Sequence, residues 1–232
     1  MSKKPIYGLV TSQAEMAKKT DDLSVVMYEI KDVLGVHRSP IPGTVSMVSC
    51  FADNQWIKEH PEYVAVSKDG MKATRKEKYF DWDCLCPSRA DWKEKMLELI
   101  KMADGQGEVR LDDIGFPREN FCWCEACQEE WKKSGISDWE TWRGHVITEF
   151  VKTCREATRN RLYMTLYPDP IKEHHYFRFG IDVDAVADYV DCFVVPIYDL
   201  HYSVTYWLET LAWGFKDMLP KPFFIELYAC DI

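Results

Sequence analysis

Two neighbouring groups of reactive side chains stand out in the middle of the sequence. Asp112 and Asp113 lie at the end of a segment that we expect to form a short buried strand, and Cys122, Cys124 and Cys127 follow shortly afterwards. In α/β folds reactive groups collect at strand ends, where a carboxyl group can transfer a proton or attack an electrophilic carbon. The spacing Cys-x-Cys-x-x-Cys lets three thiolates bind one tetrahedral cation. The sequence therefore predicts carboxylate chemistry beside a metal site.

A tetrahedral site needs a fourth ligand, and an upstream segment offers two candidates. We favour Cys86 over Cys84, because four-cysteine sites usually draw their ligands from two loops. Buried free thiols, disulfides and a redox pair are the alternatives, and buried cysteine is common in protein cores. Four thiolates would leave no open position for water, which argues against metallohydrolase chemistry. We predict one structural Zn²⁺ ion held by Cys86 and the three clustered cysteines.

Composition narrows the class of protein. The 232 residues are 47% hydrophobic, which suits one globular domain over residues 1–232. The net charge of −9 argues against a nucleic-acid-binding surface. We see no signal peptide and no apolar run long enough to span a membrane. Nine cysteines, an odd number, fit a reducing compartment, so we expect a cytoplasmic protein.

Short β-branched or aromatic segments alternate with amphipathic ones, a pattern typical of βαβ units and a parallel sheet. The region 12–34 suits either a helix or a strand, and we expect a helix there. Helices are also expected at 90–102, 138–158, 182–189 and 204–217. Strands are expected at 6–10, 44–51, 108–114, 162–167, 192–198 and 223–228.

Several of these strands end in polar residues, as a (β/α) barrel requires for an active site at the carboxyl ends of its strands. A doubly wound open sheet is the alternative, but no glycine-rich phosphate turn supports it. We therefore predict an α/β fold of the (β/α) TIM-barrel type. Side chains at or just after the strand ends could bind substrate or only cap helices. These candidates are Tyr167, Asp169, Tyr198, Asp199 and His201.

Three motifs within residues 44–150 resemble the (β/α)-barrel glycoside hydrolases of the large retaining clan, in particular family 42 β-galactosidases and their relatives. The first is His60-Pro-Glu-Tyr-Val-Ala-Val-Ser-Lys-Asp-Gly70, similar to the loop after the third strand. The second is Cys86-Pro-Ser-Arg-Ala-Asp-Trp92, similar to that family's Cys-Pro-Asn-Ser-Pro segment. The third is Cys122-Trp-Cys-Glu-Ala-Cys127, similar to its zinc-binding loop.

The resemblance implies roles for three acidic residues. It places Asp113 at the acid/base position after the fourth strand, preceded by Asp112 where an asparagine is usual, and Glu226 at the nucleophile position after the seventh strand. Retaining glycosidases need such a pair, because one group protonates the leaving oxygen while the other attacks the anomeric carbon. Asp113 departs from the family's glutamate, which shortens the acid by one methylene.

The sequence stops at Ile232, before an eighth strand and its helix. We therefore expect a barrel that is incomplete or truncated at its C-terminal end, and the exposed edge would need cover, for example by a homo-oligomer. The predicted activity is glycoside hydrolysis with a carbohydrate or other small molecule as substrate. The rival hypothesis is a catalytically silent carbohydrate-binding or scaffold protein that keeps the zinc site.

Overall fold

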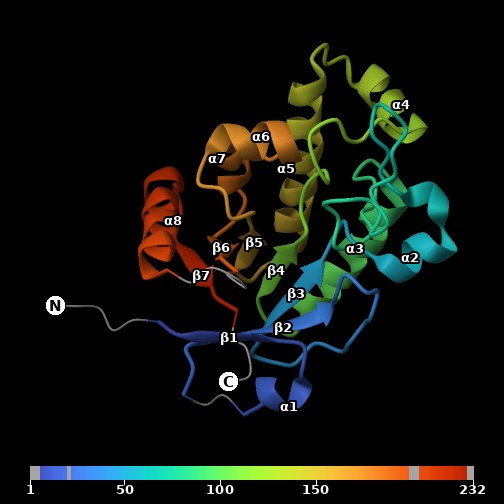
Figure 1. Ribbon diagram of the computed structural model, residues 1–232. Coiled ribbons are helices and arrows are strands. Elements are labelled where there is room, and N and C mark those ends of the chain that lie inside the picture. Colours follow the sequence, from blue (N-terminus) through green and yellow to red (C-terminus); the bar gives the residue numbers. More distant parts are fainter. Residues whose placement is uncertain (1–5, 20–21, 199–203, 229–232) are drawn as a thin grey trace.

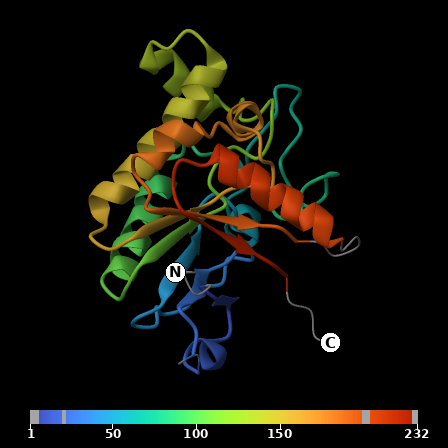
Figure 2. The same cartoon turned by 90° about the vertical axis from the view of Figure 1, so that its left-hand side faces the viewer.

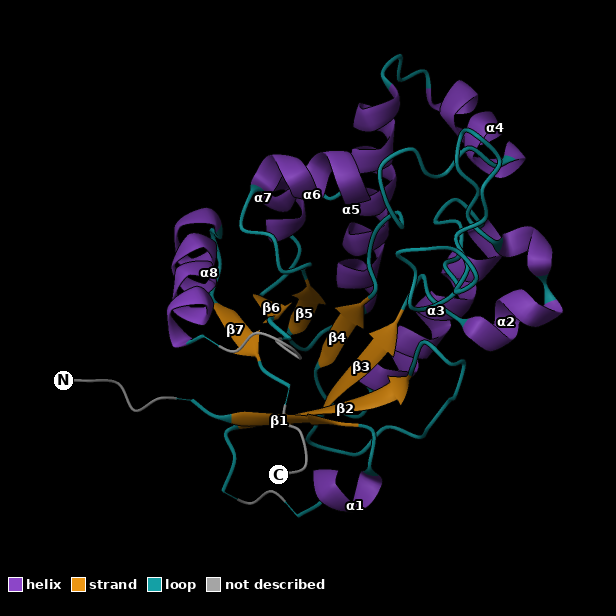
Figure 3. Cartoon of the chain, in the orientation of Figure 1, coloured by secondary structure: helices purple, strands orange, loops and turns teal. Residues whose placement is uncertain are grey.

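The computed structural model describes residues 6–19, 22–198 and 204–228. Its centre is one sheet of seven parallel strands in sequential order, curved into a nearly closed barrel (Figures 1 and 3). This arrangement confirms the predicted incomplete (β/α) barrel. The strands are β1 (Gly8–Thr11), β2 (Val25–Lys31), β3 (Val45–Ser49), β4 (Val109–Asp112), β5 (Leu162–Thr165), β6 (Cys192–Pro196) and β7 (Phe223–Glu226).

Helices connect the strands and cover the outside of the barrel. Asp53, Asp138 and Asp182 are the N-cap residues of three of them, and each carboxylate accepts a hydrogen bond from a backbone N–H of the first turn. Helices α3 and α5 pack against each other, with α3 beside β3 and β4 (Figure 1). The helices are α1 (Ala14–Ala17), α2 (Asn54–Glu59), the 3₁₀ turn η1 (Pro61–Tyr63), α3 (Ala90–Asp104), α4 (Glu125–Ser134), α5 (Trp139–Ala157), α6 (Lys172–Phe179), α7 (Val183–Ala187) and α8 (Thr205–Met218).

The helix expected over residues 12–34 is wrong. Among the residues of this region that the structure describes, only the four of α1 are helical, and β2 pairs in parallel with both β1 and β3. Its side chains alternate between two environments: Tyr28 and Ile30 belong to the core under the helices, whereas Val25 and Met27 pack inside the barrel. Pairing with strands distant in sequence therefore overrides the local helical spacing.

The barrel has two cores. The large one lies between the sheet and its helices, and the small one fills the barrel interior with Met27, Val45, Tyr163, Cys192 and Val194. Because successive side chains of a strand point to opposite faces, strands β2, β3, β5 and β6 contribute buried residues to both cores. This alternation decides which polar side chains enter the barrel.

The sheet is not closed between its first and last strands. Within the described residues β1 pairs only with β2 and β7 only with β6, and the two edge strands face each other across a gap (Figure 2). In the same ranges, no helix has the combination of length and apolar character that crossing a bilayer requires. The unpaired edges leave the barrel interior accessible from the side.

Candidate active site and metal site

A buried arginine links two of the predicted acidic residues inside the barrel. Arg110 lies on β4 and is 1% exposed. Its Nη1 donates a hydrogen bond to Oε2 of Glu226 at 2.6 Å, and its Nη2 lies 3.7 Å from Oδ1 of Asp112. Burial opposes its charge, but Asp112 and Glu226 together hold the pKa of Arg110 above its ordinary value. The arginine therefore bridges the carboxyl ends of β4 and β7.

Glu226 is the last residue of β7, the position that the resemblance implies for a nucleophile. Besides the bond from Arg110, its Oε1 accepts a hydrogen bond from the hydroxyl group of Tyr198, which follows β6. Tyr198 is thus one of the predicted substrate-binding residues that the structure brings next to a predicted catalytic residue. Two donors, one on β4 and one just after β6, fix the orientation of the Glu226 carboxylate.

Asp113 has different partners from Asp112. It follows β4 with a φ of 49°, in the left-handed region, and its Oδ2 accepts a hydrogen bond from Ser49 Oγ of β3 at 2.6 Å. Burial raises the pKa of Asp113 to about 7, and the neighbouring charge of Asp112 adds to the effect. The structure thus pairs Asp112, not Asp113, with Glu226 through the shared arginine.

The raised pKa of Asp113 predicts how stability changes with pH. Its ordinary value is 3.8, so between about pH 4 and 7 the folded protein binds a proton that the unfolded chain releases. The contribution of Asp113 to stability is therefore lost as the pH rises through 7. We expect Asp113→Asn to raise the free energy of unfolding by about 1–2 kcal/mol at pH 8 and to leave it nearly unchanged at pH 4.

Urea unfolding of both proteins at several pH values measures this difference. The asparagine keeps an oxygen for the Ser49 hydroxyl group, so the substitution tests the charge and not the hydrogen bond. A difference between the two proteins that does not change with pH would contradict the assignment.

A cavity of about 850 Å³ opens between the two unpaired edge strands, and we call it the seam cavity. Its polar side chains include Glu29, Tyr198 and Glu226, while neither Asp112 nor Asp113 lines it. The rest of the wall is largely apolar. The lining consists of residues 6–13 and 224–228 around the two edges, together with Met16, Val25, Met27, Glu29, Met47, Val194 and Tyr198.

Glu29 is the acidic residue that the sequence analysis missed. It lies on β2, and burial raises its pKa to about 7, with further contributions from the charges of Asp32 and Asp112. The signal was present in the alternation of Val25, Met27 and Glu29, which a strand directs to one face. The helix expected over this region would not direct these three side chains to one face, so the sequence analysis did not identify Glu29 as a site residue.

Two of the predicted substrate-binding residues lie against α6. The ring of Tyr167 stacks on Phe179 with 3.7 Å between centroids. The carboxylate of Asp169 contacts His174 at 2.8 Å and Arg178 at 3.4 Å. These contacts hold α6 to the end of β5. Asp199 and His201, also predicted to bind substrate, lie outside the described residues.

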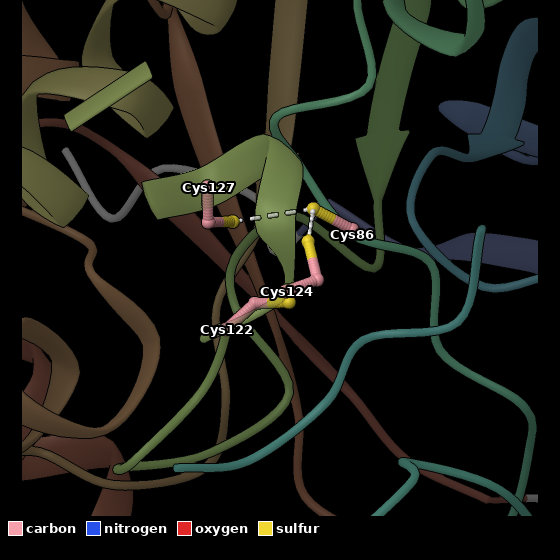
Figure 4. A group of neighbouring side chains, drawn as sticks. All are labelled: Cys86, Cys122, Cys124 and Cys127. Atoms are coloured by element: carbon pink, nitrogen blue, oxygen red, sulfur yellow. Dashed lines mark hydrogen bonds between the residues drawn. The ribbon is translucent and has the colours of Figure 1, made fainter. Parts of the chain in front are cut away.

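The predicted metal ligands form one cluster in the structure. The Sγ atoms of Cys86, Cys122, Cys124 and Cys127 all lie within 4.8 Å of one another, and their sulfur atoms point together (Figure 4). The Sγ of Cys86 is 3.3 Å from the Sγ atoms of both Cys124 and Cys127. Cys84, the alternative fourth ligand, is not part of this group.

The geometry fits a thiolate-bound cation. Zinc–sulfur bonds of about 2.3 Å in a tetrahedron place sulfur atoms about 3.8 Å apart, close to the spacing in this cluster. The backbone N–H of Val66 donates a hydrogen bond to Cys122 Sγ at 3.3 Å, which also suits a thiolate. Burial raises the pKa values of Cys86 and Cys127, so a nearby cation would be needed to deprotonate them. The four cysteines could therefore hold a metal ion.

The cluster ties together loops that follow two neighbouring strands. Cys86 belongs to the long connection between β3 and α3, while the other three cysteines lie between β4 and the first turn of α4. A hydrogen bond from Trp123 N to Val66 O, at 2.7 Å, joins the same loops. A metal ion here would fix the chain that follows Asp113.

Comparisons with known proteins support the fold at low sequence identity. No protein-family model and no curated protein matches the sequence. The structure is similar to α-L-fucosidase isoenzyme 2 from Paenibacillus thiaminolyticus, with a TM-score of 0.55 and 10% identity over 89% of this chain and 41% of that one. An α-galactosidase from Thermus thermophilus gives a TM-score of 0.49 and 14% identity, over 91% of this chain and 46% of that one. The chain thus spans less than half the length of either enzyme, and the fucosidase comparison shows a shared barrel fold.

Proposed function

We propose that this protein cleaves a glycosidic bond by a two-carboxylate retaining mechanism in which Glu226 is the nucleophile. The observation that carries the proposal is the position of Glu226 at the end of β7, where it lines the seam cavity and is held by Arg110 and Tyr198. The barrel fold adds support, because the fucosidase that shares it is named as a glycosidase. A carbohydrate is therefore the proposed substrate class.

The chemistry divides between two carboxyl groups. The carboxylate of Glu226 attacks the anomeric carbon while another group protonates the departing oxygen. The sequence resemblance assigns that second role to Asp113, and a pKa of about 7 keeps a fraction of it protonated at neutral pH. In its more specific form, the proposal is that the protein is related to family 42 β-galactosidases and acts in the cytoplasm.

The cysteine cluster has a separate role in the proposal. It binds one Zn²⁺ ion, because four thiolates in a closed tetrahedral shell are typical of structural zinc. No position remains for water or substrate, so the ion stabilises the loop after Asp113 and takes no part in the bond cleavage. Its binding energy contributes to folding, since the ligands come together only in the folded chain.

A mechanism-based label tests the proposal directly. We expect a 2-deoxy-2-fluoroglycosyl fluoride of the correct sugar to form a stable ester with Glu226. The fluorine at C2 slows both formation and hydrolysis of the glycosyl-enzyme, while the anomeric fluoride, a good leaving group, speeds only its formation. Galactose, fucose and glucose derivatives cover the first panel. Peptide mass spectrometry then identifies the labelled residue, and Glu226→Gln is the unlabelled control. A label elsewhere would contradict the nucleophile assignment.

A second candidate function is a carbohydrate-binding protein without turnover. It is favoured by one observation: Asp113, the acid that the resemblance implies, does not line the cavity that contains Glu226. Calorimetric titration with sugars distinguishes the two functions. If sugars bind saturably but no aryl glycoside of the panel releases its leaving group, the result would favour a carbohydrate-binding protein without catalytic activity.

A further inference from the structure

We propose that Glu29, rather than Asp113, is the general acid and base that works with Glu226, so that substrate binds in the seam cavity between β1 and β7. The inference rests on the proposed glycosidase function and deepens it. It assigns the second catalytic role to a residue that neither the resemblance nor the sequence pattern identified.

The cavity brings the two glutamates together from different strands. Glu29 enters it from β2 and Glu226 from β7, on either side of the opening between the unpaired edges. Asp113 does not line this space, and its carboxylate is occupied by the hydroxyl group of Ser49. A ligand in the seam cavity would therefore meet Glu29 and Glu226 but would not reach Asp113.

The two glutamates have unlike surroundings, as acid and nucleophile require. Glu226 accepts hydrogen bonds from Arg110 and Tyr198, which stabilise a negative carboxylate. The carboxyl group of Glu29 accepts none from the described residues, since Arg38 bonds only its backbone oxygen. Burial and nearby negative charge raise its pKa to about 7. Five charged groups lie near the Glu29 carboxyl group. Asp32 and Arg38 follow β2, and Arg110, Asp112 and Asp113 belong to β4 and the residue after it.

The rest of the cavity suits a small polar ligand with an apolar face. Tyr7, Tyr198 and Tyr228 lie among its lining residues, and the rings of Tyr198 and Tyr228 are 6.1 Å apart. Aromatic rings commonly pack against the apolar face of a bound ligand while their hydroxyl groups bond its polar edge. A volume of about 850 Å³ is large enough for one or two sugar rings.

The proton and bond changes balance over two steps. In the first, Glu29 gives its proton to the glycosidic oxygen, the bond from that oxygen to the anomeric carbon breaks, and Glu226 forms an ester with the anomeric carbon. In the second, the Glu29 carboxylate takes a proton from water, the water oxygen bonds to the anomeric carbon, and Glu226 leaves as a carboxylate. Each residue returns to its starting state.

Leaving-group dependence tests the assignment, because an acid matters most when the departing alcohol is a poor leaving group. For Glu29→Gln we expect kcat/KM to fall about 10²–10⁴-fold on alkyl glycosides and less than about tenfold on 2,4-dinitrophenyl glycosides. Azide should accelerate Glu29→Ala and yield a glycosyl azide of retained configuration, because this small anion needs no base. The matched control is Glu94→Gln on the exposed side of α3, which should equal the wild type.

The outcomes separate this inference from the proposed function. If Asp113→Asn shows the leaving-group dependence and Asp113→Ala the azide rescue, while Glu29→Gln and Glu29→Ala show neither, Glu29 is not the acid, and the glycosidase function stands. If Glu226→Gln retains full activity, or no glycoside is cleaved by the wild type, both proposals fall.

A measurement on the wild-type protein tests the assignment without depending on whether the variants fold. Glutamate labelled with ¹³C at Cδ should show one resonance that titrates near pH 7 and that shifts when a substrate analogue fills the cavity. If every glutamate titrates below about pH 5, the inference is overturned.

Discussion

Glu226→Gln is expected to lower kcat by about 10³-fold or more, the largest loss of activity from any single substitution in this protein. The amide cannot form the glycosyl ester, and loss of a covalent nucleophile removes the main reaction path. The side chain keeps its size and one oxygen to accept the hydrogen bond from Arg110, so the protein should remain folded. Release of the aryl leaving group measures turnover, and circular dichroism measures folding.

The control for this experiment is again Glu94→Gln, which makes the same chemical change on an exposed helix surface. Surface substitutions of this kind usually change stability by less than about 0.5 kcal/mol. A Glu226→Gln protein that is folded and cleaves glycosides at the wild-type rate would disprove the nucleophile assignment.

The second large effect concerns the cysteine cluster. We expect Cys122→Ala to remove about one equivalent of bound zinc and to lower the free energy of unfolding by about 3 kcal/mol or more, because metal binding contributes directly to folding. A strong chelator should produce a similar loss in the wild type. Elemental analysis under reducing conditions and thermal melting with and without chelator provide the measurements.

Cys84→Ala is the matched control. Cys84 is buried like Cys122 and lies two positions before Cys86, yet it does not belong to the cluster. We expect full zinc content and a cost of only about 1 kcal/mol from the small cavity. Less than about a tenth of an equivalent of metal in the wild type, with melting unaffected by chelator, would show that the four cysteines are ordinary core thiols.

Much of the fold was predictable because its helices and strands have strong local patterns. Helix α5 repeats buried residues at helical spacing and lies within the helix expected over residues 138–158, with Asp138 as its N-cap. Strand β6 is a short apolar run between polar turns, as is typical of a buried parallel strand. Strand β2 was missed because Leu23, Val26, Ile30 and Val33 also fit a helix, and only pairing with β1 and β3 decides between the two.

The amino-acid sequence by itself determined the positions of the acidic strand ends and the close spacing of Cys122, Cys124 and Cys127, since both are local properties of the chain. The sequence favoured Cys86 but left Cys84 as an alternative, and only the fold decided between them, because the two differ in where a long loop places each sulfur. The pairing of Glu226 with Arg110 and the presence of Glu29 in the same cavity were also decided by tertiary structure. The physical reason is that barrel curvature and strand register bring together side chains that are far apart in sequence.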